Sequence, residues 1–538
     1  MRSKTIVIGA LQKHLAFQDD LLRKLAGKTL VQRAIEKAGE LGVNGQAIYV
    51  YTDSEMVALS AERAGVSAYL DPKLHLEERA SVEKFFEFLQ QLSRKTDWIF
   101  HLSPYAPLLK VEVLLEAQRR IESEKADVVT GVRPIVDYQT GTDSENLMAQ
   151  FFRAPLKKVK AHSDAFTLIR ASSLKKDATD KLKIITVSLD ENEFEVRSQR
   201  DWWVCEKLLE RKRIIFRVIG TDAAGMGHIY RSLSLAHEIT DHEIIFVTDT
   251  KNQAAVDELA KYEYQLKVYE PDCLLGEIAA LKPDLVINDI LNTRSRDVQF
   301  LQKGGARVIN FEDLGEGARL ANITFNELYD KPQYGGENTR WGHEYFFVRD
   351  EFNDARPCPF RTEVSGILLA FGGIDQHDLT RKILFSIVDL CSARGIHIFV
   401  VTGPGYSGFK KLAQEVQPFE NITITHATGV ISQYMEKVSL AITSNGRTVY
   451  EMAHMNIPAI VIPQHDRERT HAFACEQNGF IPLAPYTEGA TEEKAATSLK
   501  RLLDSVSERK KLYNRTVDFR FDQNKKHVVQ LIESCLDR

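Results

Sequence analysis

The chain has 538 residues, of which 43% are hydrophobic and 27% are charged, and its formal net charge at pH 7 is −5. A chain of this length exceeds one hydrophobic core, so we expect two or three domains. The small net charge gives no indication of binding to nucleic acid or to a membrane surface. No apolar stretch is long enough to span a bilayer, and the run 5–11 is too short for the core of a signal peptide. We therefore expect a cytoplasmic protein without a membrane span.

Six cysteines are scattered along the chain without Cys-x-x-Cys spacing, at Cys205, Cys273, Cys358, Cys391, Cys475 and Cys535. This distribution argues against a disulfide framework and against a zinc site. We expect buried, reduced thiols, and we predict no metal and no cofactor.

The first part of the chain alternates strands and helices up to about residue 212. The predicted strands are 5–8, 47–51, 98–102 and 127–130, and the predicted helices are 29–41, 56–64, 81–93 and 111–123. This alternation is typical of an α/β domain with a parallel sheet covered by helices. We assign a Rossmann-like domain to residues 1–212, because the basic stretch 210–213 ends a helix there.

Most of residues 1–210 resembles the nonulosonate (sialic-acid type) cytidylyltransferases. Leu25-Ala26-Gly27-Lys28 matches the end of that family's nucleotide loop, and Tyr51-Thr52-Asp53 ends the next strand as it does in the family. The resemblance implies a nucleotidyltransferase domain of the GT-A-like type.

The catalytic positions of this family are not kept. The family's loop reads Ala-Arg-x-Gly-Ser and then Lys-Asn, and this chain departs from it at Leu11, Gln12, Lys13, His14, Asp20 and Leu21. The segment 102–108 keeps the frame of the family's Leu-Gln-Pro-Thr-Ser-Pro-Leu without its polar side chains. Glu195-Val196-Arg197, followed by Asp201, replaces the Asp-x-Asp whose carboxylates hold magnesium in the family, and an arginine repels that ion. We predict a domain without cytidylyltransferase activity, for which a sugar, a nucleotide or a protein partner stays open as the ligand.

The second part of the chain repeats the alternation of strands and helices twice. Its predicted strands are 214–219, 243–247, 266–269, 285–288 and 307–310, and then 366–370, 396–401, 422–426, 440–443 and 459–462. We therefore predict two Rossmann-like lobes, at 213–350 and 351–538, that face a cleft as in the GT-B architecture.

A glycine turn follows the first strand of this second part. It runs from Asp222 through Gly225 and Gly227 to His228, and it leads into a helix that carries Arg231. Glycines let the backbone approach a ligand closely, and the N–H groups at a helix N-terminus suit a phosphate. Taken alone, such a turn is often only a tight turn, and a lone histidine at a helix start is often a cap.

Three further turns follow strands of the second lobe. They contain the polar and glycine residues Gly372, Gly373, Asp375, Ser444, Asn445, Gly446, Thr448, Glu451 and Arg467. The turn at 444–451 could hold a diphosphate on its N–H groups, while Glu451 accepts hydrogen bonds from ribose hydroxyls. It could equally be a capped helix with a solvated glutamate, and the loop 463–469 could be merely solvated.

Three of these turns, at 225–231, 371–375 and 444–451, together resemble the UDP-sugar hydrolase of pseudaminic acid biosynthesis and its spore-coat relatives. These proteins are themselves related to the lipid-linked N-acetylglucosaminyltransferase of peptidoglycan synthesis. The match covers about residues 214–485 and implies that His228 is the base that activates water and that Glu451 holds the ribose. It further implies a diphosphate site formed by Gly372, Gly373 and Ser444 to Gly446. Asp222 is a second catalytic candidate, and Gly225, Gly227, Arg231, Asp375, Thr448 and Arg467 complete the predicted substrate site.

The expected function is hydrolysis of a UDP-sugar in nonulosonate or surface-glycan biosynthesis, with a homo-oligomer left open. Only Ala223-Ala224 separates Asp222 from Gly225, and this short spacing is closer to the transferase than to the hydrolases. A glycosyltransferase therefore remains an alternative. A non-catalytic scaffold is a second alternative, against which the presence of His228 and Glu451 argues.

Overall fold

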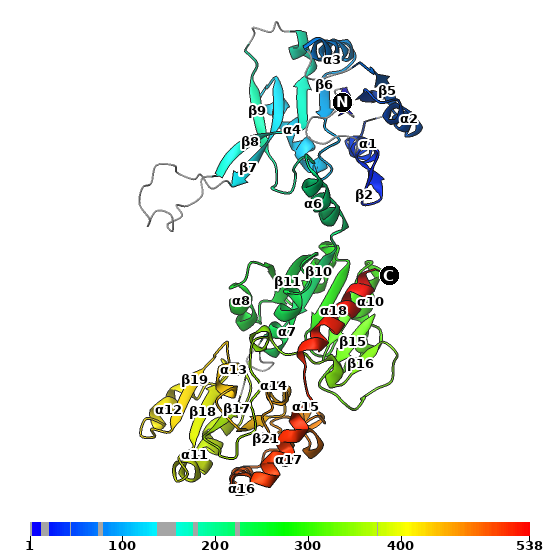
Figure 1. Cartoon of the computed structure of the whole chain (residues 1–538). Coiled ribbons are helices and arrows are strands. Elements are labelled where there is room, and N and C mark those ends of the chain that lie inside the picture. Colours follow the sequence, from blue (N-terminus) through cyan, green and yellow to red (C-terminus); the bar gives the residue numbers. More distant parts are fainter. Residues whose placement is uncertain are drawn as a thin grey trace, which may run out of the picture. The chain divides into compact units, whose positions relative to one another are not determined.

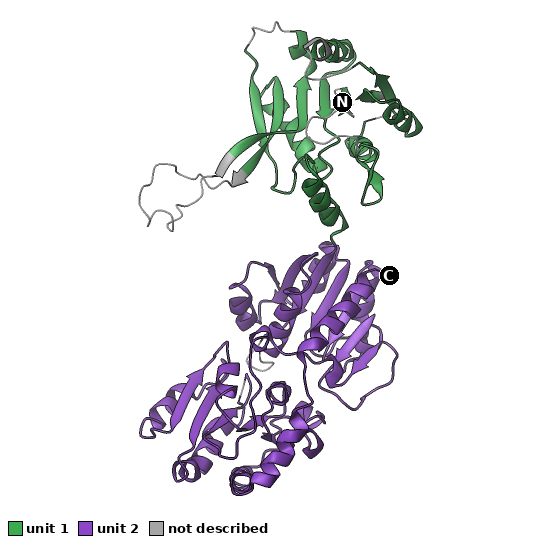
Figure 2. Ribbon diagram, in the orientation of Figure 1, with its two compact units in different colours: residues 1–211 green, residues 212–538 purple. Residues whose placement is uncertain are grey.

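The computed structural model describes residues 3–11, 21–43, 45–73, 79–136, 158–175, 181–220, 226–373 and 375–537. The chain divides into two compact units, residues 1–211 and residues 212–538 (Figure 2). Each unit has its own sheets and its own buried cores. The division of the second unit at residue 350 stays a prediction.

Unit 1 is built on one seven-stranded sheet in the order β5-β4-β1-β6-β8-β7-β9 (Figure 1). Its strands are β1 (Lys4–Ala10), β2 (Lys24–Leu25), β3 (Lys28–Thr29), β4 (Ile48–Thr52), β5 (Ser67–Leu70), β6 (Trp98–Leu102), β7 (Val128–Val136), β8 (Lys158–Arg170) and β9 (Ile184–Ser188), of which β2 and β3 form a separate hairpin. Its helices are α1 (Leu30–Glu40), α2 (Glu55–Arg63), α3 (Arg79–Leu92), α4 (Val111–Ser123) and α6 (Gln199–Glu210).

The sheet of unit 1 is mixed, so the expectation of a parallel sheet is wrong for one half of it. Strands β4, β1 and β6 are parallel, as predicted, and β5, which was not predicted, is parallel to β4. Strand β8 runs antiparallel to both β6 and β7, and β9 returns parallel to β7. No strand was predicted at 158–170, so its antiparallel pairing with β6 and β7 was not expected.

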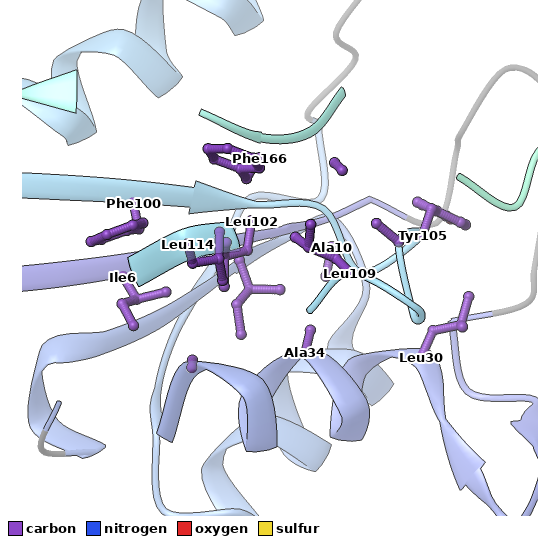
Figure 3. Packing of buried hydrophobic residues seen from close by; sticks show 14 of the residues in the cluster. Ile6, Ala10, Leu30, Ala34, Phe100, Leu102, Tyr105, Leu109, Leu114 and Phe166 are labelled. Carbon is purple, nitrogen blue, oxygen red and sulfur yellow. The ribbon is translucent and has the colours of Figure 1, made fainter. Parts of the chain in front are cut away.

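The first core of unit 1 lies between this sheet and the helices that cover it. Figure 3 shows Ala34 on α1 pointing toward the strand residues, among them Ile6 and Ala10. Helix α1 begins at a capping box, in which the Thr29 side chain accepts from the Gln32 N–H and the Gln32 side chain accepts from the Thr29 N–H. The capping box therefore starts α1, and the apolar face of this helix packs it on the sheet.

Unit 2 contains two parallel sheets. The first has β10 (Arg213–Val218), β11 (Glu243–Asp249), β12 (Gln265–Tyr269), β13 (Leu285–Asp289), β14 (Arg307–Phe311), β15 (Ile323–Asn326) and β16 (Thr339–Trp341), with α7 (Gly227–Ala236), α8 (Gln253–Leu259), α9 (Leu274–Ala280) and α10 (Ser295–Lys303). The second has β17 (Gly366–Ala370), β18 (His397–Thr402), β19 (Ile422–His426), β20 (Leu440–Ser444), β21 (Ala459–Ile462) and β22 (Phe480–Pro482), with α11 (Leu379–Ser392), α12 (Phe409–Glu415), α13 (Ser432–Met435), α14 (Thr448–His454), α15 (Asp466–Arg469), α16 (Ala490–Asp504) and α17 (Val506–Thr516).

The strand orders of the two sheets are β12-β11-β10-β13-β14-β15-β16 and β19-β18-β17-β20-β21-β22. Both are doubly wound, and their order reverses between β10 and β13 and between β17 and β20. Ligands of such sheets bind at the carboxyl ends of the strands beside this reversal. The predicted fold class, an α/β domain followed by a two-lobed unit, is confirmed by this topology. Strands β15, β16 and β22 were not predicted.

The last helix, α18 (Asp522–Leu536), returns to the first sheet of unit 2. Its residues Val528 and Ile532 share a buried cluster with Ile214 and Phe216 of β10. Figure 1 draws α18 beside this sheet rather than beside α16 and α17. The final segment therefore joins the two lobes, which the assignment of all of 351–538 to the second lobe did not anticipate.

Four of the six free cysteines are buried, whereas Cys273 is exposed and Cys475 is partly exposed. Within the part of the chain that the structure describes, no helix is long and apolar enough to cross a membrane.

Candidate active site

A cavity of about 310 Å³ lies in unit 2, where residues that follow strands of both sheets come together. Most of the predicted site residues line it: Gly227, His228, Gly372, Gly373, Ser444, Gly446, Thr448, Glu451 and Arg467. The turns that contain them follow β10, β17, β20 and β21, so the cavity lies at the strand ends where doubly wound sheets bind ligands.

Three predicted substrate ligands, Arg231, Asp375 and Asn445, are not among the residues that line the cavity. Asp375 accepts hydrogen bonds from the N–H groups of Leu379 (2.7 Å) and Thr380 (2.6 Å), and so caps the start of α11. The Asn445 side chain donates to the main-chain oxygens of residues 468 and 471. Arg231 is fully buried. Their partners in the structure are thus protein groups, and their direct contact with substrate stays a prediction. Asp222 and Gly225 lie outside the described residues.

His228 is held by a carboxylate that the sequence analysis missed. Its Nδ1 lies 2.6 Å from Oδ1 of Asp289, the last residue of β13. A carboxylate only accepts, so Nδ1 carries the proton of this hydrogen bond, and the approach of Arg231 Nη2 at 3.2 Å is a contact rather than a second bond. In the neutral ring, Nε2 is then the atom with a free lone pair. No hydrogen bond to Nε2 comes from the residues that the structure describes.

Arg231 is the centre of a buried charge cluster beneath His228. Its guanidinium contacts Asp289 (Nε to Oδ2, 2.8 Å), Glu312 (Nη1 to Oε2, 2.9 Å) and Glu327. Burial alone would lower the pKa of Arg231, but the three carboxylates outweigh it and raise that pKa. Burial likewise opposes the charge of Asp289, yet Arg231 and His228 hold its pKa below the ordinary value. The cluster fixes Asp289, and Asp289 in turn fixes the His228 ring.

Glycines form the opposite wall. Gly372, directly after β17, has φ +78°, a conformation that glycine adopts without strain. A Cβ on Gly403, in the turn after β18, would lie 2.4 Å from the oxygen of Gly372, so the two turns pack backbone to backbone. A Cβ on Gly446 would lie 3.4 Å from Glu468 Oε1. Substituents at these turns would narrow the cavity.

Glu451 lines the cavity but already has a partner, which the sequence analysis did not foresee. Its Oε1 accepts from Nε of Arg349 at 3.0 Å. Arg349 also pairs with Glu351 at 2.8 Å, and these carboxylates outweigh burial and raise the pKa of the arginine. Any contact of Glu451 with ribose would therefore use its remaining acceptor capacity. Arg349 lies outside the predicted elements, and no local pattern marks it.

Two arginines of the second lobe reach acceptors of the first. Arg447 Nη1 lies 2.7 Å from Glu327 Oε1, and its Nη2 donates to the Phe347 oxygen at 3.2 Å. Arg467 Nη2 donates to the main-chain oxygen of Glu312. Both arginines line the cavity. The two lobes are thus joined by charged side chains at the cavity itself.

The loop after β21 adds a buried imidazole to the wall. Nδ1 of His471 donates to the Asn445 oxygen at 2.7 Å, and burial lowers the pKa of this histidine. Its Nε2 has no partner among the described residues. Gln464, His465 and Glu468 of the same loop also line the cavity, so this loop contributes more than the predicted Arg467.

Unit 1 carries a charged cluster of a different kind. Arg197 Nη2 lies 3.0 Å from Asp164 Oδ2 and 3.6 Å from Glu195 Oε2, and its N–H donates to Asp201 Oδ2 at 2.9 Å. Glu195 also accepts from the Ser163 hydroxyl. The arginine therefore neutralises carboxylates at the position where the resemblance expected a magnesium site. Over the described ranges, no group of three or more His, Cys, Asp or Glu side chains is arranged to hold a metal.

The other divergent positions of unit 1 are only partly described. Leu11 is buried, and its oxygen accepts from the Tyr105 hydroxyl at 3.0 Å. Leu21 is buried in the first core. Gln12, Lys13, His14 and Asp20 lie outside the described residues.

Each part of the chain is similar to a known protein family over a segment of its length. The cytidylyltransferase family matches residues 17–183, and the C-terminal domain of glycosyltransferase family 28 matches residues 367–528. The uncharacterized protein MJ1062 of Methanocaldococcus jannaschii is 28% identical over 270 residues, which are 46% of this chain and 55% of that protein. The chain thus spans about half the length of this archaeal relative.

Two further proteins are similar to the second unit. The spore coat polysaccharide biosynthesis protein SpsG of Bacillus subtilis is 22% identical over 303 residues, 54% of this chain and 88% of SpsG. The crystal structure of Acinetobacter baumannii MurG superposes with a TM-score of 0.43 at 13% identity, over 60% of this chain and 99% of MurG. Residues 17–183 are thus similar to the cytidylyltransferases, and residues 367–528, within the two-sheet second unit, are similar to the C-terminal domain of glycosyltransferase family 28.

Proposed function

We propose that unit 2 binds a UDP-sugar in its cavity and cleaves the bond between the anomeric carbon and the diphosphate, with water as the acceptor. The proposal places this reaction in surface-polysaccharide or nonulosonate biosynthesis. It is supported by the family 28 match, by the name of the SpsG relative and by the set of glycine turns that line one cavity.

His228 acts as the general base in this reaction. Nε2 takes a proton from water as the water oxygen bonds to the anomeric carbon, and the electrons of the breaking C–O bond go to the oxygen of the departing UDP. Asp289 accepts from Nδ1, which holds the ring in one tautomer and one orientation. The products are the free sugar and UDP.

The observation that carries the proposal is the His228–Asp289 pair at the rim of a cavity. The pair needs a carboxylate at the end of β13 and a histidine at the start of α7, which lie 61 residues apart. Unlike His237, which forms a similar pair with Asp350 at the other end of α7, His228 lines the cavity.

Transfer of the sugar to another hydroxyl is the second candidate. It is favoured by the family 28 match and by the short spacing between Asp222 and Gly225. The same base would take the proton from the acceptor hydroxyl in place of water. The two reactions differ only in the acceptor.

The test is incubation of the full chain with a panel of UDP-, CMP- and GDP-sugars in H₂¹⁸O, with and without sugar acceptors. Hydrolysis is expected to release UDP without an acceptor and to place ¹⁸O in the sugar. Release that requires an added acceptor would replace the hydrolase by the transferase. No cleavage of any nucleotide sugar under either condition would overturn both.

A further inference from the structure

Arg447 is a charged residue of the diphosphate turn that neither resemblance assigns. It follows β20, lines the cavity and is 15% exposed at its side chain. Its side chain crosses from the second lobe to the first over the glycine turn, since a Cβ on Gly227 would lie 3.2 Å from Arg447 Cδ. The guanidinium lies over the Phe346 ring at 4.5 Å and beside Glu327. Arg447 therefore sits next to the residue that precedes His228.

The partner of Arg447 is shared. Arg231 Nη1 and Arg447 Nη1 both contact Oε1 of Glu327, while Glu327 Oε2 has no partner among the residues described. Burial and then the neighbouring Arg231 lower the pKa of Arg447, and they outweigh the carboxylates around it. Its environment therefore leaves the charge of Arg447 incompletely compensated. A second anion in the cavity would be stabilised there.

We propose that Arg447 receives the diphosphate of the nucleotide sugar, and that it leaves Glu327 when it does so. The inference rests on the proposed function, because it needs a nucleoside diphosphate in this cavity. Arg447 passes beside Gly227, which directly precedes the proposed base His228, so in this proposal it meets the phosphate bonded to the sugar, where negative charge develops as the C–O bond breaks. Glu327 then keeps only its contact with Arg231. Arg447 exchanges the carboxylate of Glu327 for the phosphate of the substrate.

This exchange predicts opposite effects for the two partners of one salt bridge. Arg447→Gln should weaken the binding of UDP to the full chain at least about tenfold, as expected for a lost charge-assisted hydrogen bond, and should leave the binding of UMP unchanged. Glu327→Gln removes the competing anion and should tighten UDP binding severalfold. Arg447→Lys keeps the charge without the forked geometry and should recover part of the affinity.

The measurement is isothermal titration calorimetry with UDP and UMP, together with the melting temperature of each variant. Arg509→Gln is the matched control, because Arg509 is a buried arginine of the same lobe that donates only to main-chain oxygens and does not line the cavity. It should lower the melting temperature without changing UDP affinity. If Glu327→Gln does not fold, the UDP affinities of Arg447→Gln, Arg447→Lys and Arg509→Gln still show whether Arg447 binds the diphosphate.

Several outcomes would overturn the inference. One is wild-type UDP affinity in Arg447→Gln, and another is an equal loss of UDP and UMP binding. A loss of UDP affinity in a folded Glu327→Gln would mean that the bridge is only a clamp between lobes. Calorimetry needs no turnover, so a chain that binds UDP through Arg447 but cleaves no sugar would refute the proposed function alone. A wild-type chain that binds no UDP would refute both the proposed function and the inference that rests on it.

Discussion

Each unit of the molecule has an arginine among carboxylates, but the two clusters lie in different environments. In unit 1 the side chains of Arg197 and Asp164 are 48% and 71% exposed. In unit 2 those of Arg231 and Asp289 are fully buried. Exposed pairs contribute little to stability, whereas a buried charge depends on its partners. The same residue types therefore neutralise a surface in unit 1 and hold a catalytic candidate in place in unit 2.

The two regions also differ in what the charges surround. The arginine of unit 1 pairs with carboxylates at the position where the cytidylyltransferases that it resembles would hold a cation. The cluster of unit 2 leaves a cavity of about 310 Å³, with His228, Arg447 and Glu451 on its walls. We therefore expect the chemistry of this chain in unit 2, and the following experiments test that difference.

The largest effect is expected for His228→Asn. Loss of the general base should reduce the turnover of a nucleotide sugar by about 10²–10⁴-fold with little change in its affinity. Steady-state kinetics and calorimetry measure the two effects separately. His237→Asn is the control, because His237 forms a similar pair with Asp350 (2.7 Å) at the other end of α7, away from the cavity. An unchanged rate, or a joint loss of binding and rate, would make His228 a structural or ground-state contact.

The second effect compares the two clusters directly. Arg231→Met takes the shared cation from three buried carboxylates, of which Glu327 keeps Arg447 and Asp289 keeps His228, and should lower the free energy of unfolding by about 3–5 kcal/mol. Arg197→Met removes an exposed arginine and should lower it by less than about 1 kcal/mol. Urea unfolding followed by circular dichroism gives both values. Equal losses would show that burial does not distinguish the clusters.

Acid should act on unit 2 through the same cluster. Burial opposes the charge of Asp289, but Arg231 and His228 hold its pKa below the ordinary value of 3.8. A carboxylate with a lowered pKa contributes stability that is complete above the ordinary value and is lost as the pH falls through the lowered one. The wild type should therefore lose stability below about pH 4. Arg231→Met, which has already lost this contribution, should change less over the same range.

A smaller effect is expected for Glu451→Gln. Loss of a hydrogen bond from ribose to a charged acceptor should weaken nucleotide-sugar binding by about 1.5–3 kcal/mol while the fold stays intact. The variant also takes one carboxylate from Arg349. Glu351→Gln provides the control, since it takes the other carboxylate from Arg349 without lining the cavity. If both variants bind the nucleotide sugar equally well, the role of Glu451 is only to pair with Arg349.

The smallest response is expected from unit 1. The full chain should release no pyrophosphate from CTP in the presence of magnesium and a nonulosonic acid, because Arg197 already pairs with Asp164 and Glu195. A coupled pyrophosphate assay measures this. Release that a substitution in unit 1 abolishes would contradict the prediction and would remove the contrast between the units.

Local patterns in the sequence were sufficient to find most strands and the turns that follow them. The strands predicted at 214–219, 366–370 and 440–443 correspond to β10, β17 and β20. The predicted and observed ends differ by at most one residue. Gly227-His228, Gly372-Gly373 and Ser444 to Gly446 follow them as predicted, because a buried strand and a glycine turn are each encoded by adjacent residues. The sheet orders then bring these turns to one cavity.

Only the tertiary structure decided which charged groups meet. Asp289 comes to His228, Arg349 to Glu451, and Arg447 to Glu327 across 61, 102 and 120 residues of sequence. The antiparallel placement of β8 and the return of α18 are likewise settled by partners far along the chain. Hydrophobic periodicity reports which face of an element is buried, but not which buried side chain lies opposite. Which charged groups pair depends on which side chains lie opposite one another, and this is determined when the sheets and lobes pack together.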